Sequence, residues 1–152
     1  MSQEVTPVDM QAATDAVLAG QSLAEHLGFS QDLMRLLYAT AVGHYEAGRY
    51  PQSILVLTQL TPLDSRNPDA WALLGNCMLR EGRFAEALEA WSLSLHLKPS
   101  YPTALQVARA AIAQKDRTTA AVALMAMNKH GTTDEHQATL IEVGQALMAL
   151  AD

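Results

Sequence analysis

The side chains best able to do chemistry in this chain are one cysteine, Cys77, and five histidines: His26, His44, His96, His130 and His136. No two histidines are four residues apart, so the His-Glu-x-x-His pattern of a helical zinc site is absent. Cys77 has no basic neighbour in sequence, which favours a small buried apolar residue over a nucleophile. We therefore predict no enzymatic activity, no catalytic residue, no metal site and no cofactor.

A second kind of chemistry is the recognition of another polypeptide. Tyr38 and Tyr45 combine an apolar ring with a polar hydroxyl, which suits a peptide pocket. Asn76 and Gln106 can each donate and accept hydrogen bonds, so either could hold the backbone of an extended strand. Two alternatives stay open, because tyrosines at helical spacing also fill cores and Asn76 could be a solvated helix residue.

These residues lie within an internal repeat. The triplet Gly48-Arg49-Tyr50 recurs as Gly82-Arg83-Phe84, and pairs such as Ser53 and Ala87 keep the same offset. This offset of 34 residues is the length of a tetratricopeptide unit, which is a pair of antiparallel helices joined by a tight turn. The sequence predicts an all-α fold, a tetratricopeptide-repeat superhelix of about three helix pairs with an N-terminal helix and a C-terminal capping helix.

The clearest copy of the repeat covers residues 68–101. Pro68 can start its first helix, where a missing N–H costs nothing, and Pro99 can stop its second. Gly75 is small enough for close helix packing, and Gly82 stands where the chain leaves the first helix with a left-handed backbone. The large residues expected in the core are Trp71, Leu74, Phe84 and Trp91, together with Tyr50 of the preceding copy.

The other copies and the two ends complete the expected organisation. The three repeats are placed over 34–135, and the third is the weakest because Arg109 stands where the repeat calls for a small residue. Gly20 should end the first helix of the N-terminal segment, and Ser30 should cap the helix that follows it. We expect residues 1–8 to be disordered and residues 9–30 to form an N-terminal helical segment. The three repeats are expected over 34–67, 68–101 and 102–135, and the capping helix over 136–152.

The concave surface of such a superhelix is lined by the first helix of each pair. One face of these helices carries Arg35, Tyr38, Val42 and Tyr45 in the first repeat, Asp69, Ala72, Asn76 and Leu79 in the second, and Thr103, Gln106, Ala110 and Ala113 in the third. From this set we expect the peptide-binding residues to be Tyr38, Val42, Tyr45, Ala72, Asn76, Leu79 and Gln106. The mixture of aromatic and small residues favours apolar or proline-bearing segments.

The composition excludes several other functions. The formal net charge of the 152 residues is -6 and the ten basic residues are scattered, so the cationic surface of a nucleic-acid-binding protein is absent. The longest apolar run, 120–127, is far shorter than the roughly 20 residues of a membrane-spanning helix. Because Arg35 is the first basic residue, we expect no signal peptide and a cytoplasmic protein.

Several short motifs follow one another in a distinctive order. They are Val17-Leu18-Ala19-Gly20 at the end of an apolar helix, then Leu37-Tyr38, then Tyr45, Gly48 and Tyr50, and finally Leu74-Gly75-Asn76-Cys77. Over about residues 10–130 this order resembles the class II chaperones of bacterial type III secretion, which bind the pore-forming translocator proteins.

The resemblance implies a cytoplasmic chaperone that uses no cofactor. Such a protein would hold an extended segment of a hydrophobic translocator in its concave face and keep it soluble until export. It would also form a homodimer through its N-terminal helix, here through Met10, Ala13, Val17 and Leu18. Two alternatives remain beside it: a tetratricopeptide chaperone of a needle or filament subunit, and a general protein-interaction scaffold.

Overall fold

The computed structural model describes residues 10–150, which fold into helices joined by short turns. The nine helices of this range are α1 (Met10–Leu18), α2 (Leu23–His26), α3 (Gln31–Glu46), α4 (Tyr50–Leu63), α5 (Pro68–Arg80), α6 (Phe84–Leu97), α7 (Tyr101–Ala113), α8 (Arg117–His130) and α9 (Asp134–Ala149). The all-α prediction is confirmed. The expectation of disorder over 1–8 lies outside the described residues, as does the very end of the chain. None of the described helices is long and apolar enough to cross a bilayer.

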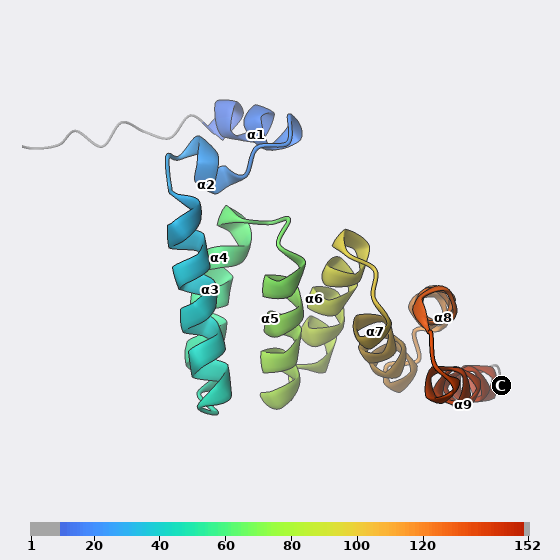
Figure 1. The fold of residues 1–152 in the computed structure, drawn as a ribbon. Helices are drawn as coiled ribbons and strands as arrows, with labels where there is room; N and C mark the ends of the chain where they lie inside the picture. The colour runs from blue at the N-terminus through green and yellow to red at the C-terminus, as the bar shows by residue number, and fades with distance from the viewer. Residues whose placement is uncertain (1–9, 151–152) are drawn as a thin grey trace, which may run out of the picture.

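From α3 to α9 the helices form a row in which each packs on the next along the chain. The pairs are α3 with α4, α5 with α6, and α7 with α8, while α9 packs on α8 and α7. Figure 1 shows that the helix axes turn progressively along this row, from α3, which stands upright, to α9, which is seen nearly end-on. This turning is the superhelix expected of stacked helix pairs.

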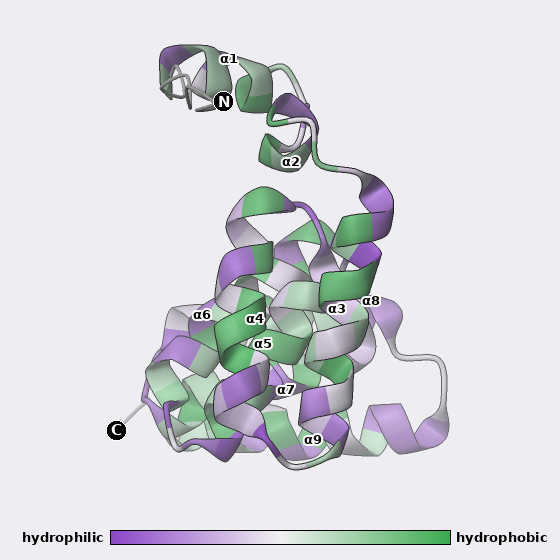
Figure 2. Ribbon diagram, turned by 90° about the vertical axis from the view of Figure 1, so that its left-hand side faces the viewer, coloured by the Kyte–Doolittle hydropathy of each residue, from purple (hydrophilic) through white to green (hydrophobic). Residues whose placement is uncertain are grey.

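The N-terminal helices stand clear of this row (Figure 2). The first of them, α1, packs on α2, and α2 contacts α4. Gly20 has a φ of 98° directly after α1, so the chain turns there with a backbone that only glycine adopts readily. Ser30 caps α3 as expected, because its hydroxyl accepts a hydrogen bond from the backbone N–H of Leu33.

The second pair, α5 and α6, is packed most closely. Trp91 is 2% exposed, and its indole ring lies so near Gly75 that an added Cβ would stand 2.5 Å from it. Pro68 is the first residue of α5, and Gly82 follows α5 with a φ of 72°. Ser94 ties the two helices together, since its hydroxyl donates to the carbonyl of Pro68 over 2.8 Å. The structural roles assigned to Pro68, Gly75, Gly82 and Trp91 are confirmed.

The third pair starts earlier than the sequence period suggested. Both α7 and α8 begin one residue before the positions that the period, counted from α5 and α6, would give them. Lys115, at a φ of 59°, occupies the place of Gly82. The small residue of this pair is Ala108, which is fully buried. The expectation that Arg109 replaces a small residue was therefore wrong, because a strict period placed α7 one position out of register.

Phe84 was predicted to lie in the core but is 58% exposed. Its counterpart in the first pair, Tyr50, packs on Tyr45 with ring centroids 5.5 Å apart and lies under the guanidinium of Arg80 at 5.9 Å. At the next junction Leu79 replaces Tyr45 and Ala113 replaces Arg80, so no long side chain covers Phe84. Trp91 and Leu74 are buried as expected, while Trp71 and Tyr50 are only partly buried.

The closeness of α5 and α6 gives a first prediction. Gly75→Ala should lower the free energy of unfolding by about 1–3 kcal/mol, because the new methyl group would overlap the indole of Trp91. Urea unfolding followed by circular dichroism measures this change. Gly43→Ala is the matched control, since an added Cβ there meets nothing within 4 Å and should be neutral or stabilising by up to about 1 kcal/mol. Equal stabilities of the two variants would contradict the packing described.

Candidate peptide-binding groove

The predicted peptide-binding residues lie on the first helices of the three pairs and none of them is sealed in the core. Tyr38, Val42 and Tyr45 on α3, Ala72 and Asn76 on α5, and Gln106 on α7 are all partly buried. Leu79, at the end of α5, is 38% exposed. The structure gathers some of these residues around two separate hollows. Tyr38 lines one of them, while Leu79 and Gln106 line the other.

The first hollow, which we call the acidic pocket, has a volume of about 230 Å³ and is half polar. The amide of Asn67 fixes one side of it, because Nδ2 donates to Oδ2 of Asp64 over 3.3 Å and Oδ1 accepts from the first amides of α5. Burial, with a smaller contribution from the negative charge of Asp69, raises the pKa of the Tyr38 hydroxyl, which stays a hydrogen-bond donor. The lining residues are Gln31, Met34, Arg35, Tyr38, Asp64, Asn67 and Asp69.

The second hollow, which we call the aromatic pocket, has a volume of about 210 Å³ and almost entirely apolar walls. It lies where α5 and α6 meet α7, and it exists because Ala110 and Ala113 are short. At the preceding junction the equivalent positions hold the longer side chains of Cys77, which is buried, and Arg80, which lies over the ring of Tyr50 at 5.9 Å. The lining residues are Leu79, Phe84, Ala87, Trp91, Gln106, Arg109, Ala110 and Ala113. Phe84, assigned to the core from sequence, and Arg109 were therefore missed as groove residues.

Asn76 lies on α5 between Asp69, which lines the acidic pocket, and Leu79, which lines the aromatic pocket. The orientation of its side-chain amide is fixed by Trp91. The indole Nε1 donates a hydrogen bond to Oδ1 of Asn76 over 3.0 Å. Because an indole can only donate, the amide oxygen must face it, and the amide nitrogen keeps both of its protons for another acceptor. Asn76 can thus donate to a backbone carbonyl of a chain that crosses α5.

The cysteine and the histidines have structural surroundings. Cys77 is fully buried, with its Sγ 3.3 Å from the hydroxyl of Ser53. That hydroxyl donates to the carbonyl of Ala41 over 2.8 Å, so α3, α4 and α5 are linked at this point. His136 stacks on Tyr101 with ring centroids 3.8 Å apart. Within residues 10–150, no three side chains of His, Cys, Asp or Glu come together so that they could hold a metal ion.

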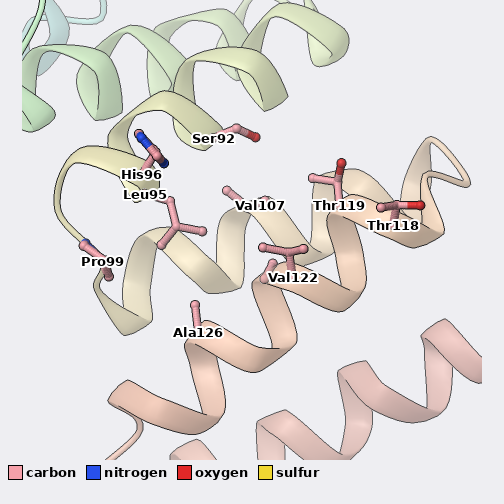
Figure 3. A pocket seen from close by; sticks show the side chains of 10 residues that line it. Ser92, Leu95, His96, Pro99, Val107, Thr118, Thr119, Val122 and Ala126 are labelled. Atoms are coloured by element: carbon pink, nitrogen blue, oxygen red, sulfur yellow. The ribbon is translucent and has the colours of Figure 1, made fainter.

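A larger hollow, of about 450 Å³, shares no lining residue with the two pockets (Figure 3). It is formed mainly by α6 and α8, the second helices of their pairs. Sequence reasoning did not find it. The short side chains of α8 are the only signal that could have suggested it. The lining residues are Ser92, Leu95, His96, Pro99, Val107, Thr118, Thr119, Val122, Ala123 and Ala126.

The residues expected to form a dimer lie on one apolar face of α1. Met10 is 72% exposed and Leu18 is 79% exposed, so both are open to a partner. Val17 is partly buried, and Ala13, at 4% exposure, is covered within the protomer itself. Together with Thr14 and Leu23 these residues surround a shallow hollow of about 260 Å³.

Comparisons with known proteins agree with this geometry. The family profile named "Tetratricopeptide repeat" matches residues 68–101, which contain α5 and α6. The structure of the Yersinia enterocolitica type III secretion translocator chaperone SycD superimposes with a TM-score of 0.65 at 21% sequence identity, covering 86% of this chain and 98% of that one. The chain shares the fold of the type III secretion translocator chaperones. A search among curated protein sequences gave no match.

Two further structures with this chaperone fold contain a bound partner. PcrH, a protein of Pseudomonas aeruginosa, in complex with the chaperone binding region of PopD superimposes with a TM-score of 0.64 at 22% identity, covering 82% of this chain and 95% of that one. A type III secretion complex from Aeromonas hydrophila gives a TM-score of 0.74 at 19% identity, covering 93% of this chain and 95% of that one. The match to the translocator chaperones therefore spans most of the chain.

The surroundings of Cys77 give a second prediction. Burial raises the pKa of its thiol, with smaller opposing and assisting contributions from Ser53 and Glu81, so the reactive thiolate is scarce at neutral pH. Dithionitrobenzoate should therefore react with the native protein at least about tenfold more slowly than with the urea-unfolded protein near pH 8. The absorbance of the released thiolate measures both rates. Equal rates would show that Cys77 is accessible and reactive.

Proposed function

We propose that this protein is a cytoplasmic secretion chaperone that binds an extended segment of hydrophobic type III translocator proteins in its concave groove. The observation that carries the proposal is the placement of two hollows and one oriented amide along the first helices of the pairs. The shared fold supports it, because proteins with this fold have been solved with a translocator peptide and with chaperone binding regions. No cofactor takes part.

The groove suits an extended chain because contacts to client side chains, at the two pockets, alternate with a contact to the client backbone, at Asn76. The aromatic pocket takes an apolar side chain, and full burial of one such side chain contributes about 1.5–3 kcal/mol. The amide of Asn76 then holds the backbone, and the acidic pocket takes a second side chain near Tyr38. Holding the client in this way shields an apolar stretch from water and from other clients, which keeps the translocator soluble and competent for export.

The same proposal includes a homodimer formed through α1. Met10 and Leu18 are exposed on a short helix that stands clear of the row (Figure 2). They form an apolar surface whose exposure to water is unfavourable. A second copy of the same surface would cover it. Solved structures of SycD include an alternative dimer, so dimers occur among proteins of this fold.

The alternatives differ in the shape of the bound chain. A needle or filament subunit that binds as a helix would need a continuous apolar trough for residues spaced by three and four. The groove instead offers two hollows separated by polar Asn76, which favours an extended segment. A general scaffold would bind neither class of secretion protein. Co-expression with the products of neighbouring genes, followed by pull-down, distinguishes the three functions. Capture of a product with long transmembrane stretches supports the translocator chaperone.

The groove itself can be blocked. Ala72→Arg places a long side chain on α5 between the two pockets and should weaken binding of the co-expressed translocator at least about tenfold, or about 1.4 kcal/mol. Isothermal titration with the purified binding segment measures the change. Ala121→Arg is the matched control, since Ala121 is exposed on α8, away from the groove. If both variants bind as the natural protein does, the client does not occupy this groove.

The dimer can be tested independently. Leu18→Glu should convert the dimer into monomers, because it places a charge on the apolar face of α1 without touching the core of the protomer. Sedimentation velocity measures the mass. Leu55→Glu serves as the control, because Leu55 is 62% exposed on α4 and its substitution should leave the dimer intact. A Leu18→Glu protein that sediments as the natural protein does would rule out this interface.

A further inference from the structure

The two pockets of the groove carry opposite charges. The acidic pocket is lined by Asp64 and Asp69, and its single cation, Arg35, is paired with Asp32 over 2.8 Å. In the aromatic pocket Arg109 is the only charged residue of the lining. Arg109 has no ion pair or hydrogen bond to another side chain within residues 10–150, so its guanidinium remains available to a ligand.

The position of Arg109 follows from the early start of the third pair. Because α7 begins one residue early, Arg109 takes the place that Asn76 holds on α5, one repeat further along the same face of the groove. Arg109 is exposed at the edge of this pocket, next to walls of leucine, phenylalanine, tryptophan and alanine side chains, so an ion pair formed there is partly screened by solvent. A guanidinium also binds a carboxylate through two parallel hydrogen bonds, which adds geometric selectivity.

We infer that the groove selects its client segment by charge polarity, an inference that rests on the proposed function. The selected segment carries a bulky apolar residue for the aromatic pocket with an acidic residue beside it, which pairs with Arg109. A basic residue of the same segment lies toward the acidic pocket, where Asp64 and Asp69 attract it. A segment with the charges exchanged meets like charges at both ends of the groove.

The spacing between these client residues follows from α5. Asp69 and Leu79 mark the two pockets on this helix, and a rise of about 1.5 Å per residue separates them by about 15 Å. An extended chain covers about 3.3 Å per residue, and the pockets lie on opposite sides of α5, so the basic residue and the apolar residue are at least about five positions apart. Asn76 lies between the two pockets and can hold a carbonyl of the intervening backbone.

Two synthetic peptides of identical composition test this polarity. In the first, leucine stands beside aspartate, and lysine lies about five residues away. In the second, the lysine and the aspartate are exchanged, and both peptides are made in the two chain directions. The first peptide should bind about fivefold to tenfold more tightly in low salt, as measured by fluorescence anisotropy, and the difference should shrink in about 1 M salt.

Substitutions in the protein assign the effect to Arg109. Arg109→Glu should abolish or reverse the preference between the two peptides, whereas Arg117→Glu, an exposed arginine on α8, should leave it unchanged. The two peptides could bind the natural protein equally and both be blocked by Ala72→Arg. That result would overturn the charge selectivity but would still support binding in the groove. An equal effect of the Arg117 variant would also overturn the charge selectivity, because only overall charge would then matter. Failure of both peptides to bind at about 1 mM would remove the groove as a binding site and the polarity with it.

Discussion

The contact between Trp91 and Gly75 is the interaction on which the groove depends. Because Gly75 lacks a side chain, α6 comes close enough for the indole of Trp91 to lie against the backbone of α5. From that position the indole N–H donates a hydrogen bond to the side-chain oxygen of Asn76 over 3.0 Å and fixes the orientation of its amide. A single buried aromatic ring thus sets both the spacing of the central helix pair and the orientation of a polar group on its concave side.

The pockets arise from differences between the repeats. At the first junction the ring of Tyr50 contacts both the ring of Tyr45 and the guanidinium of Arg80. At the second junction Ala113 takes the place of Arg80, and Phe84 is left facing an open hollow. The same backbone arrangement therefore gives contacts between long side chains in one place and an open hollow in the next. Side-chain length decides which of the two occurs.

The sequence was sufficient to predict the architecture because the period, the prolines and Gly82 each act locally. It also placed Ser30 at a helix cap for the same reason, and the position of Trp91 within the repeat placed that residue in the core. It failed where one missing residue changed the register, because Ala108 and Arg109 are adjacent and only the buried contact of Ala108 distinguishes them. It failed at Phe84 because exposure there depends on Ala113, which lies on another helix, nearly a whole repeat further along the chain. The assignment of groove residues remains a prediction that binding experiments must decide.

The early start of the third pair links these observations to function. Along the groove, the position held by Val42 in the first pair is held by Asn76 in the second and by Arg109 in the third. A strict period would have put the small side chain of Ala110 at that place. Loss of one residue thus moves a cation onto the concave face, next to a pocket that short alanines have left open. Since the acidic residues lie at the other end of α5, the groove acquires a direction that its repeated backbone alone would not supply.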